Sequence, residues 1–183
     1  MKLRRMCTAL LLSGLLLSCL SGCSGTTDEL RFGTGGTGGT YYAFGSALAP
    51  QLQNDTGSTV EVKVTTGSEA NLRLLQTGMV DLAIVQSDAL QYASKEDGAN
   101  YSAVAGLYTE ACQIVVTKDS GITSVAELAG KRVSIGELES GVTRNAEQIL
   151  MASGLTPDML QVSRLSFSDS AAAMERGEID AFF

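Results

Sequence analysis

The chain has 183 residues, with 13 basic and 20 acidic side chains, four cysteines, and neither histidine nor tryptophan. An acidic surface of this kind repels nucleic acid and anionic lipid. Without histidine the chain lacks the base that a cysteine protease needs, and without tryptophan it offers little for stacking bases or sugars.

Residues 1–22 have the pattern of a secretion signal. Lys2, Arg4 and Arg5 precede the apolar run of residues 10–17, and small residues follow it. The run is too short and too interrupted for a comfortable transmembrane helix. Its removal would take these three cations away and leave 10 basic against 20 acidic side chains, a formal charge of −10.

The signal leads into Leu20-Ser21-Gly22-Cys23, which resembles a bacterial lipobox. The resemblance implies cleavage before Cys23, a diacylglyceryl group on its sulfur, and a lipid-anchored tether over residues 23–29. An ordinary signal peptide with a chance cysteine is the alternative. Because two further cysteines leave with the signal, only Cys112 remains, and we expect it to be a small buried residue without a disulfide.

A glycine-rich loop, Gly33 to Tyr42, lies between a short apolar strand, Leu30 to Phe32, and a helix with one apolar stripe. A strand that feeds a glycine turn at the start of a helix directs free N–H groups and the positive helix end to one point. The sequence therefore predicts an anion-binding site here. The expected stripe consists of Phe44, Ala47, Leu48 and Leu52.

The spacing Gly33-x-Gly35-x-x-Gly38 also satisfies the dinucleotide-binding fingerprint. The next strand, Val60 to Val64, ends in threonines without the acidic residue that would hold a ribose hydroxyl, and no Lys-Ser/Thr pair follows the loop. A flexible Gly/Thr linker is the second alternative, and the flanking strand and helix argue against it.

Ser68 is the expected cap of the next helix. Residues 81–85 then have the nearly continuous apolar character of a central parallel strand, and the polar residues Gln86 to Asp88 follow it. Open α/β sheets place ligands at the carboxyl ends of such strands. The last two of these polar residues are equally suited to helix capping.

The second half of the chain repeats this order of elements. Residues 101–107 and 113–117 are strand-like, and Ser124 and Glu127 have the spacing of a capping box. The later elements are a strand over residues 132–135, a loop over 136–143, a helix with Val142, Ala146, Ile149 and Leu150 on one face, a strand over 162–165, and a helix capped by Ser168.

Two segments echo each other: Gly78 to Ile84 and Gly177 to Phe183 share the pattern Gly-x-apolar-Asp-x-apolar-apolar. Each segment ends a series of strand, loop, helix, strand and helix, and the series begin at Leu30 and Arg132. The pattern predicts two βαβαβ halves that form facing lobes with a ligand cleft between them.

Motifs in seven stretches carry a family resemblance over nearly the whole chain after the signal. They are Gly33 to Tyr42, Thr65 to Ser68, Asn71 to Leu75, Asp81 to Asp88, Lys118 to Ile122, Ser140 to Thr143 and Ile179 to Phe183. They resemble the TAXI subgroup of extracytoplasmic solute receptors, which serve tripartite ATP-independent periplasmic (TRAP) transporters. The resemblance implies an α/β, type II periplasmic-binding-protein fold that captures a small organic acid or amino acid, of the glutamate, glutamine or dicarboxylate kind, for a TRAP membrane permease.

Members of this family continue beyond the point where the present sequence stops, so we expect a C-terminally truncated chain. Lobe I would comprise residues 30–115 and lobe II residues 116–183, both incomplete. The loop Glu137 to Ser140 also departs from the family, since many relatives have Pro-Gly before the serine. Its two carboxylates either point to solvent or disfavour a carboxylate-rich ligand.

The resulting site hypothesis joins three loop or strand ends, with Cys23 as the membrane anchor. Helix-end N–H groups and the hydroxyls of Thr40, Ser140 and Thr143 would hold a carboxylate, with Asp88 as the ammonium partner. The candidate ligand-binding residues are Gly38, Gly39, Thr40, Tyr41, Gly67, Ser68, Gln86, Ser87, Asp88, Ser140, Gly141, Val142, Thr143 and Arg144. We expect no catalytic residue, cofactor, metal or nucleic-acid partner.

Two other functions stay open. The first is a phosphoribosyl or nucleotide enzyme that uses the glycine loop for phosphate, which the export signal and the lack of histidine disfavour. The second is an extracellular sensor or adhesion lipoprotein built on the same lobes. A neighbouring gene for a multi-span permease would favour transport, and one for a membrane histidine kinase would favour sensing.

Overall fold

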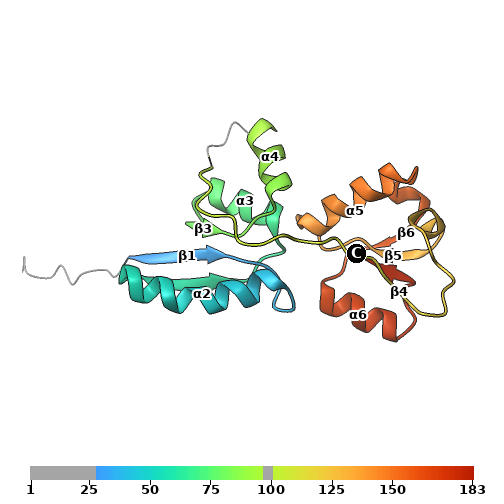
Figure 1. The fold of residues 1–183 in the computed structure, drawn as a ribbon, viewed down its shortest axis with the longest axis horizontal. Coiled ribbons are helices and arrows are strands. Elements are labelled where there is room, and N and C mark those ends of the chain that lie inside the picture. Colours follow the sequence, from blue (N-terminus) through green and yellow to red (C-terminus); the bar gives the residue numbers. More distant parts are fainter. Residues whose placement is uncertain (1–27, 97–100) are drawn as a thin grey trace, which may run out of the picture.

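The computed structural model describes residues 28–96 and 101–183. They form two α/β lobes that follow one another along the long axis of the molecule (Figure 1). No helix within these two ranges is long and apolar enough to cross a membrane. The expected signal peptide and the lipidation site at Cys23 lie outside the described residues.

The first lobe has a three-stranded parallel sheet in the order β2-β1-β3. Helix α2 lies on one side of the strands, and α3 and α4 lie on the other (Figure 1). Within the run of residues 81–85, Leu82 and Ala83 form the edge strand of this sheet, and the prediction of a central strand there is wrong because β1 takes the centre. The elements are β1 (Glu29–Gly33), α2 (Thr40–Thr56), β2 (Thr59–Lys63), α3 (Ser68–Gln76), β3 (Leu82–Ala83) and α4 (Ser87–Glu96).

Helix α2 meets the sheet through small residues. Gly45 and Ala49 are its buried residues, whereas Ala47, which we expected in the apolar stripe, is exposed. The other three residues of the expected stripe are half-buried. The buried Thr34 methyl group occupies the space that a Cβ at Gly45 would need. The absence of a side chain at Gly45 therefore allows α2 to pack closely against the sheet at this point.

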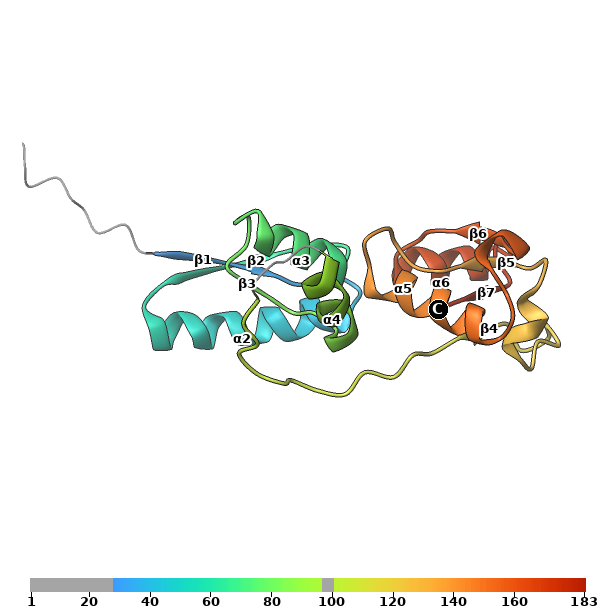
Figure 2. The same cartoon turned by 90° about the horizontal axis from the view of Figure 1, so that it is seen from above.

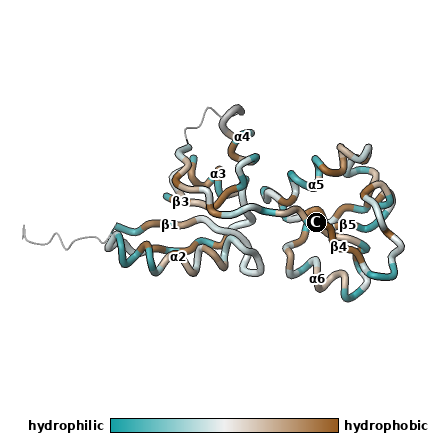
Figure 3. Tube along the Cα trace, viewed as in Figure 1, coloured by the Kyte–Doolittle hydropathy of each residue, from teal (hydrophilic) through white to brown (hydrophobic). Residues whose placement is uncertain are grey.

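The second lobe has a four-stranded sheet in the order β4-β7-β5-β6, in which only β4 is antiparallel to its neighbour. Figure 3 shows hydrophobic residues along the strands and hydrophilic ones on the outer turns of the helices. The elements are β4 (Val115–Val116), η2 (Val125–Leu128), β5 (Arg132–Ser134), α5 (Gly141–Ala152), η3 (Pro157–Met159), β6 (Gln161–Ser163), α6 (Phe167–Glu175) and β7 (Ala181–Phe182). The core comprises Leu128, Val133, Ile135, Ala146, Leu150, Leu155, Leu160, Ala181 and Phe183.

Residues 101–114 connect the lobes as an extended segment along one side of the molecule (Figure 2). The strand expected over residues 101–107 does not form, and the strand expected over 113–117 shortens to Val115–Val116. An apolar run becomes a strand only where a neighbour accepts its hydrogen bonds, and β7 pairs with just these two residues. For the same reason Cys112 is exposed, and the prediction that it is buried is wrong.

Helix starts agree with the sequence where the cap is unambiguous. The capping box of Ser124 and Glu127 is present at η2, where N–H groups hold the pKa of the Glu127 carboxyl below its usual range. Helix α6 is capped by Ser166, whose hydroxyl accepts the N–H of Asp169 at 3.1 Å. The prediction of Ser168 as its cap is therefore wrong by two positions.

The internal echo has a structural counterpart in each lobe. Asp81 accepts hydrogen bonds from the backbone N–H, Nε and Nη2 of Arg31 at 2.9, 3.0 and 2.9 Å. Asp180 accepts the same three bonds from Arg132 at 2.8, 3.1 and 2.6 Å. Each aspartate of the repeated pattern thus ties the last strand of its half to the first, which confirms the two-half organisation.

Candidate functional site

Buried polar groups hold the glycine loop between β1 and α2. Thr34 is fully buried, and its hydroxyl donates to the carbonyl oxygen of Lys63 at 2.8 Å. Its own carbonyl accepts from Thr65 Oγ1 at 2.9 Å and from Asn71 Nδ2 at 2.7 Å. Asn71 Nδ2 also donates to the carbonyl of Ile84 at 2.8 Å. One buried amide therefore joins the carboxyl ends of β1 and β3 beneath the loop.

The start of α2 presents backbone N–H groups. The carbonyl of Gly36 accepts the N–H of Gly39 at 2.8 Å, which closes the turn. Gly39 is the N-cap, with φ of −103°, and offers no side chain to accept a helical N–H. Within the described part of the chain, the N–H groups of Thr40, Tyr41 and Tyr42 have no acceptor. Such groups at a helix start can bind an anion.

The second lobe approaches this loop from the opposite side. The hydroxyl of Ser168, in the first turn of α6, occupies the space that a Cβ at Gly38 would need. The carboxylate of Glu137 lies 3.8 Å from the Cβ position of Gly36. Burial raises the pKa of the Glu137 carboxyl, and the nearby charge of Asp169 adds to the effect. Lobe II thus covers the loop with a hydroxyl and an acidic side chain.

The start of α3 differs from the prediction. Gly67, at φ of 124°, is the N-cap, and Ser68 is the first helical residue. The Ser68 hydroxyl oxygen accepts the N–H of Gln86 at 3.0 Å and lies 3.4 Å from the hydroxyl of Tyr41. The Tyr41 hydroxyl donates to Glu110 at 3.2 Å, and burial raises the pKa of this phenol. Ser68 therefore connects three elements of the first lobe instead of capping its own helix.

The start of α5 uses its side-chain hydroxyls internally. Ser140 is the N-cap and accepts the N–H of Thr143 at 3.1 Å. The hydroxyls of Ser140 and Thr143 both donate to the carbonyl of Glu137, at 2.6 and 2.7 Å. They are occupied in this arrangement, whereas the N–H groups of Gly141 and Val142 have no acceptor among the residues that the structure describes.

The two lobes meet at what we call the junction cluster. Any side chain at Gly141 would collide with Gln86 and Ser68 of the first lobe. A Cβ at Gly67 would lie 3.6 Å from the Cα of Ser140. The side-chain oxygen of Gln86 is buried without a hydrogen-bond partner in the described ranges. The junction cluster consists of Tyr41, Gly67, Ser68, Gln86, Ser140 and Gly141, six of the fourteen candidate residues.

Other candidates point elsewhere. The Asp88 carboxylate, within the first turn of α4, accepts the N–H of the next residue, Ala89, at 2.8 Å, and Ser87 is exposed. Val142 packs against the core of the second lobe. Thr40 is exposed at the start of α2. These side chains do not join the junction cluster.

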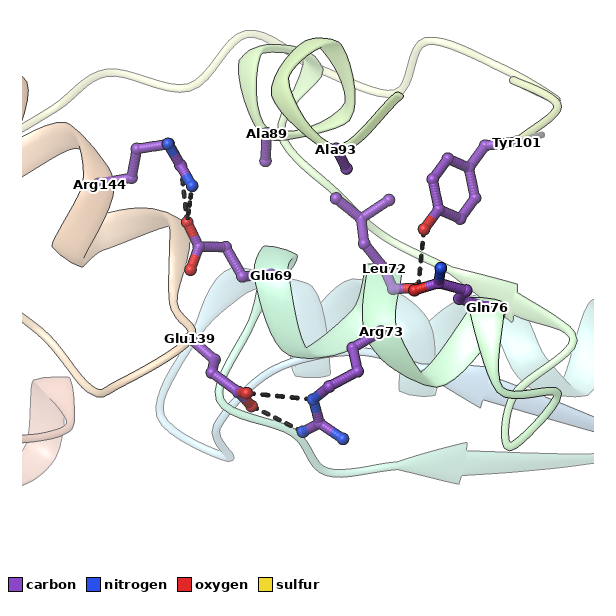
Figure 4. Close-up of a pocket in the computed structure, with 9 residues that line it drawn as sticks. All are labelled: Glu69, Leu72, Arg73, Gln76, Ala89, Ala93, Tyr101, Glu139 and Arg144. Atoms are coloured by element: carbon purple, nitrogen blue, oxygen red, sulfur yellow. Dashed lines mark hydrogen bonds and ion pairs between the residues drawn. The ribbon is translucent and has the colours of Figure 1, made fainter. Parts of the chain in front are cut away.

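Charged side chains cross between the lobes on the α3 side of the junction cluster (Figure 4). Arg144 pairs with Glu69 at 2.6 Å and lies 4.9 Å from the ring centroid of Tyr92. Arg73 holds both oxygens of Glu139, at 3.1 and 2.6 Å. Glu139 is exposed, as one of the two alternatives expected, and it also pairs with Arg73 of the first lobe. Both arginines are neutralised by protein carboxylates.

A pocket of about 270 Å³ lies beside these ion pairs, between α3 and α4 (Figure 4). Leu72, Ala89 and Ala93 form its apolar part, and Tyr101 donates a hydrogen bond to the carbonyl of Leu72 at 3.2 Å. Of the fourteen candidate residues, only Arg144 lines this pocket. It is therefore separate from the glycine loop.

Residues 32–183 match the sequence profile of one protein family, described as NMT1-like. The chain belongs to the NMT1-like family. Its fold is also found in periplasmic binding proteins of known structure. One is the alkanesulfonate-binding protein SsuA from Xanthomonas axonopodis pv. citri, bound to MOPS, which is 20% identical with a TM-score of 0.57.

Two further structures extend the comparison. The aliphatic sulphonate binding protein SsuA from Escherichia coli is 24% identical with a TM-score of 0.58, and a binding protein component of an ABC phosphonate transporter from Pseudomonas aeruginosa is 16% identical with a TM-score of 0.62. The three alignments cover 84%, 85% and 85% of this chain but 53%, 50% and 56% of the other chains. The NMT1-like chain thus has the type II periplasmic-binding-protein fold and spans about half the length of these proteins.

Several residues at the contact between the lobes of this NMT1-like protein were not predicted. Asn71 and Arg73 belong to a stretch that carries the family resemblance, but the sequence predicts no contact for them, nor any role for Glu69 or for the start of α6 opposite the glycine loop. The repeat contains one signal that could have predicted a contact. An arginine lies in the first strand of each half, and an aspartate directly precedes the last strand of the same half. The contacts across the lobes have no such signal, because their partners are more than 60 residues apart.

Proposed function

We propose that the protein is an extracytoplasmic solute-binding lipoprotein that captures a small organic acid or amino acid of the glutamate, glutamine or dicarboxylate kind. The observation that carries the proposal is the junction cluster. It brings residues from four separate stretches of the sequence to the contact between two lobes. Its glycines let the backbones of the two lobes approach each other closely at this contact.

The chemistry of the junction suits a ligand with a negative group and a hydrogen-bond donor. The free N–H groups of α2 and α5 can donate to a carboxylate, assisted by the positive ends of both helices. The unpartnered oxygen of Gln86 can accept from an ammonium or amide group. Because Asp88 already accepts a backbone N–H, we assign the donor-accepting role to Gln86.

The similar structures support an anionic ligand. Their descriptions name alkanesulfonate, aliphatic sulphonate and phosphonate as what those proteins bind or transport. An acidic protein can bind such ligands when backbone N–H groups, and not surface cations, do the binding. We therefore propose binding in place of catalysis, with no cofactor.

We further propose that the ligand is handed to a TRAP membrane permease, on the strength of the TAXI-like motifs in the glycine loop and the Asp81 to Asp88 stretch. The phosphonate protein is a component of an ABC transporter, which makes an ABC permease the competing partner. Uptake into vesicles carrying the permease of the same gene cluster separates the two, since ATP-independent uptake supports TRAP and strict ATP dependence supports ABC. A binding protein that never stimulates uptake would be a ligand sensor on the same fold.

Calorimetry of the full-length protein tests ligand capture directly. The panel is glutamate, glutamine, dicarboxylates, an alkanesulfonate and a phosphonate. We expect saturable binding of a carboxylate, with affinity reduced at least about tenfold in Gln86→Leu because a ligand donor loses its acceptor. Gln51→Leu, on the exposed side of α2, is the matched control. If no member of the panel binds, the substrate class is wrong.

A further inference from the structure

The contact between α3 and the start of α5 has its own system of bonds. The N–H of Ala70, in the first turn of α3, donates to the carbonyl of Glu139 at 3.0 Å. The carboxylate of the same Glu139 binds Arg73, and Arg144 binds Glu69 (Figure 4). One glutamate of the second lobe therefore binds α3 through both its backbone and its side chain. We call Glu69, Arg73, Glu139 and Arg144 the latch.

The charges of the latch are arranged so that partners can be exchanged. Glu69 and Arg73 stand four positions apart on α3, the spacing and order in which a glutamate and a following cation attract each other on one helix. In this structure each pairs with the other lobe instead. If the lobes separate, Glu69 and Arg73 can pair with each other, so opening need not leave either charge without a partner.

The exposure of the latch keeps its strength moderate. The side chains of the Arg73–Glu139 pair are 54% and 47% exposed, and those of the Arg144–Glu69 pair are 31% and 32% exposed. Ion pairs at this exposure are individually weak. A latch built from them can bias the lobes toward contact without preventing separation.

Glu139 also has an unusual backbone. Its φ of 60° lies in the left-handed region, and it is the one non-glycine residue with positive φ in the described ranges. This conformation is unfavourable for a residue with a Cβ and persists where surrounding contacts hold it. Here a turn within the second lobe, closed by the Ser140 N–H on the carbonyl of Glu137 at 3.2 Å, sets the conformation, and the contacts with Ala70 and Arg73 of the first lobe add to it.

Gly141 sets how closely the lobes can meet. The nearest atoms to its Cβ position belong to Gln86 and Ser68, all in the first lobe. A methyl group there would force either the Gln86 side chain or the whole first lobe away from the start of α5. The latch and Gly141 thus both affect how closely the two lobes approach each other, the latch through charge and Gly141 through its lack of a side chain.

We infer that the latch, with Glu139 at its centre, holds the two lobes together in the absence of ligand and sets the equilibrium between joined and separated lobes. This equilibrium regulates access to the site of the proposed function. The test below measures the lobes without ligand, so its result stands even if no ligand of the proposed class binds.

Pulsed electron spin resonance on the full chain tests the inference. Spin labels go on Gln53→Cys in α2 and Met159→Cys in η3, both exposed, with Cys112 replaced by serine. We expect a short inter-label distance to dominate. Arg73→Glu and Glu139→Arg should each raise the ratio of separated to joined lobes about fivefold, and the double variant should return it to within about twofold.

The control is Arg176→Glu, because Arg176 forms the same kind of pair with Glu178 inside the second lobe, at 2.7 Å. It should leave the distance unchanged. Gly141→Ala should lengthen the distance without using charge, which keeps the test valid if a charge reversal impairs folding as judged by circular dichroism. The inference is overturned if the single reversals leave the distance unchanged, if the double variant is not restored, or if Gly141→Ala has no effect.

Discussion

Asp81 holds Arg31 by three hydrogen bonds across 50 residues of sequence, from the backbone N–H and from two nitrogens of the guanidinium. The side chain of Asp81 thereby links β3, the edge strand of the first lobe, to the central strand β1. Asp180 and Arg132 repeat the arrangement in the second lobe. In each lobe, one aspartate therefore makes these hydrogen bonds only when the first and last strands of its half lie side by side.

The Asp81 pair predicts acid sensitivity. Its hydrogen bonds with Arg31 lower the pKa of the Asp81 carboxyl from 3.8 to about 2. Because the folded pKa is below the unfolded one, the stabilisation is complete above about pH 4 and is lost as the pH falls toward 2. Melting temperatures measured between pH 6 and 2 should fall less steeply for Asp81→Asn than for wild type.

The matched control for this measurement is Asp55→Asn, an exposed carboxylate in the last turn of α2. It should melt in parallel with wild type over the whole range. Parallel curves for Asp81→Asn as well would show that this pair does not couple stability to pH.

We predict that replacing Asn71, which lies beneath the glycine loop, lowers the stability of the fold. Asn71→Leu removes both hydrogen bonds of Nδ2 and leaves the buried carbonyl of Ile84 without this donor. We expect a loss of about 3 kcal/mol in the free energy of unfolding, measured by urea titration. Asn54→Leu, on the exposed end of α2, should change it by less than about 0.5 kcal/mol. Equal stabilities of the two variants would contradict the role assigned to the Asn71 amide.

We predict that a side chain at Gly39 weakens ligand binding but leaves the protein folded. A Cβ at this position would lie 3.2 Å from the Gly36 carbonyl, so the turn must shift, and the side chain of a valine would fill the space beside the ring of Phe167, 3.7 Å from the Cβ position. Gly39→Val should lose most of its ligand affinity in calorimetry and keep its circular dichroism spectrum. Gly106→Val, where no atom lies within 4 Å, is the control. Undiminished binding by Gly39→Val would remove the loop from the site.

Cys23 predicts membrane anchoring. Labelled fatty acid should enter the wild-type protein and Cys112→Ala but not Cys23→Ala, because only the lipobox-like sequence before Cys23 directs attachment. The readout is label incorporated into the purified full-length protein. Equal labelling of all three proteins would overturn the anchor.

Features decided by a few neighbouring residues could be predicted from the sequence. The capping box of Ser124 and Glu127 and the strand at Arg132 are of this kind, and both are confirmed. Ser68 shows the limit of such reasoning. Its hydroxyl could have capped its own helix, but Gly67 provides the cap and the hydroxyl binds Gln86 instead. The local sequence is compatible with either role for Ser68, and the packing of Gln86 against the start of α3 decides between them.

The candidate site was predictable only in outline. Which strand and helix ends approach one another follows from the repeated order of elements, and the junction cluster contains residues from each predicted stretch. The partners of Arg144 and Glu139 could not be predicted, because pairing across lobes depends on how two separately folded units orient. The prediction of a strand over residues 101–107 is wrong for a related reason. An apolar sequence does not by itself provide a neighbouring strand to pair with.

The backbone of Glu139 has a consequence for how this protein can evolve. At φ of 60° the position suits glycine, because a residue without a Cβ adopts the left-handed conformation at little cost. Glutamate and glycine codons differ by one nucleotide. A single base change at this codon would relax the loop and delete the carboxylate that binds Arg73, so the tightness of the contact between lobes is open to selection without any change of fold.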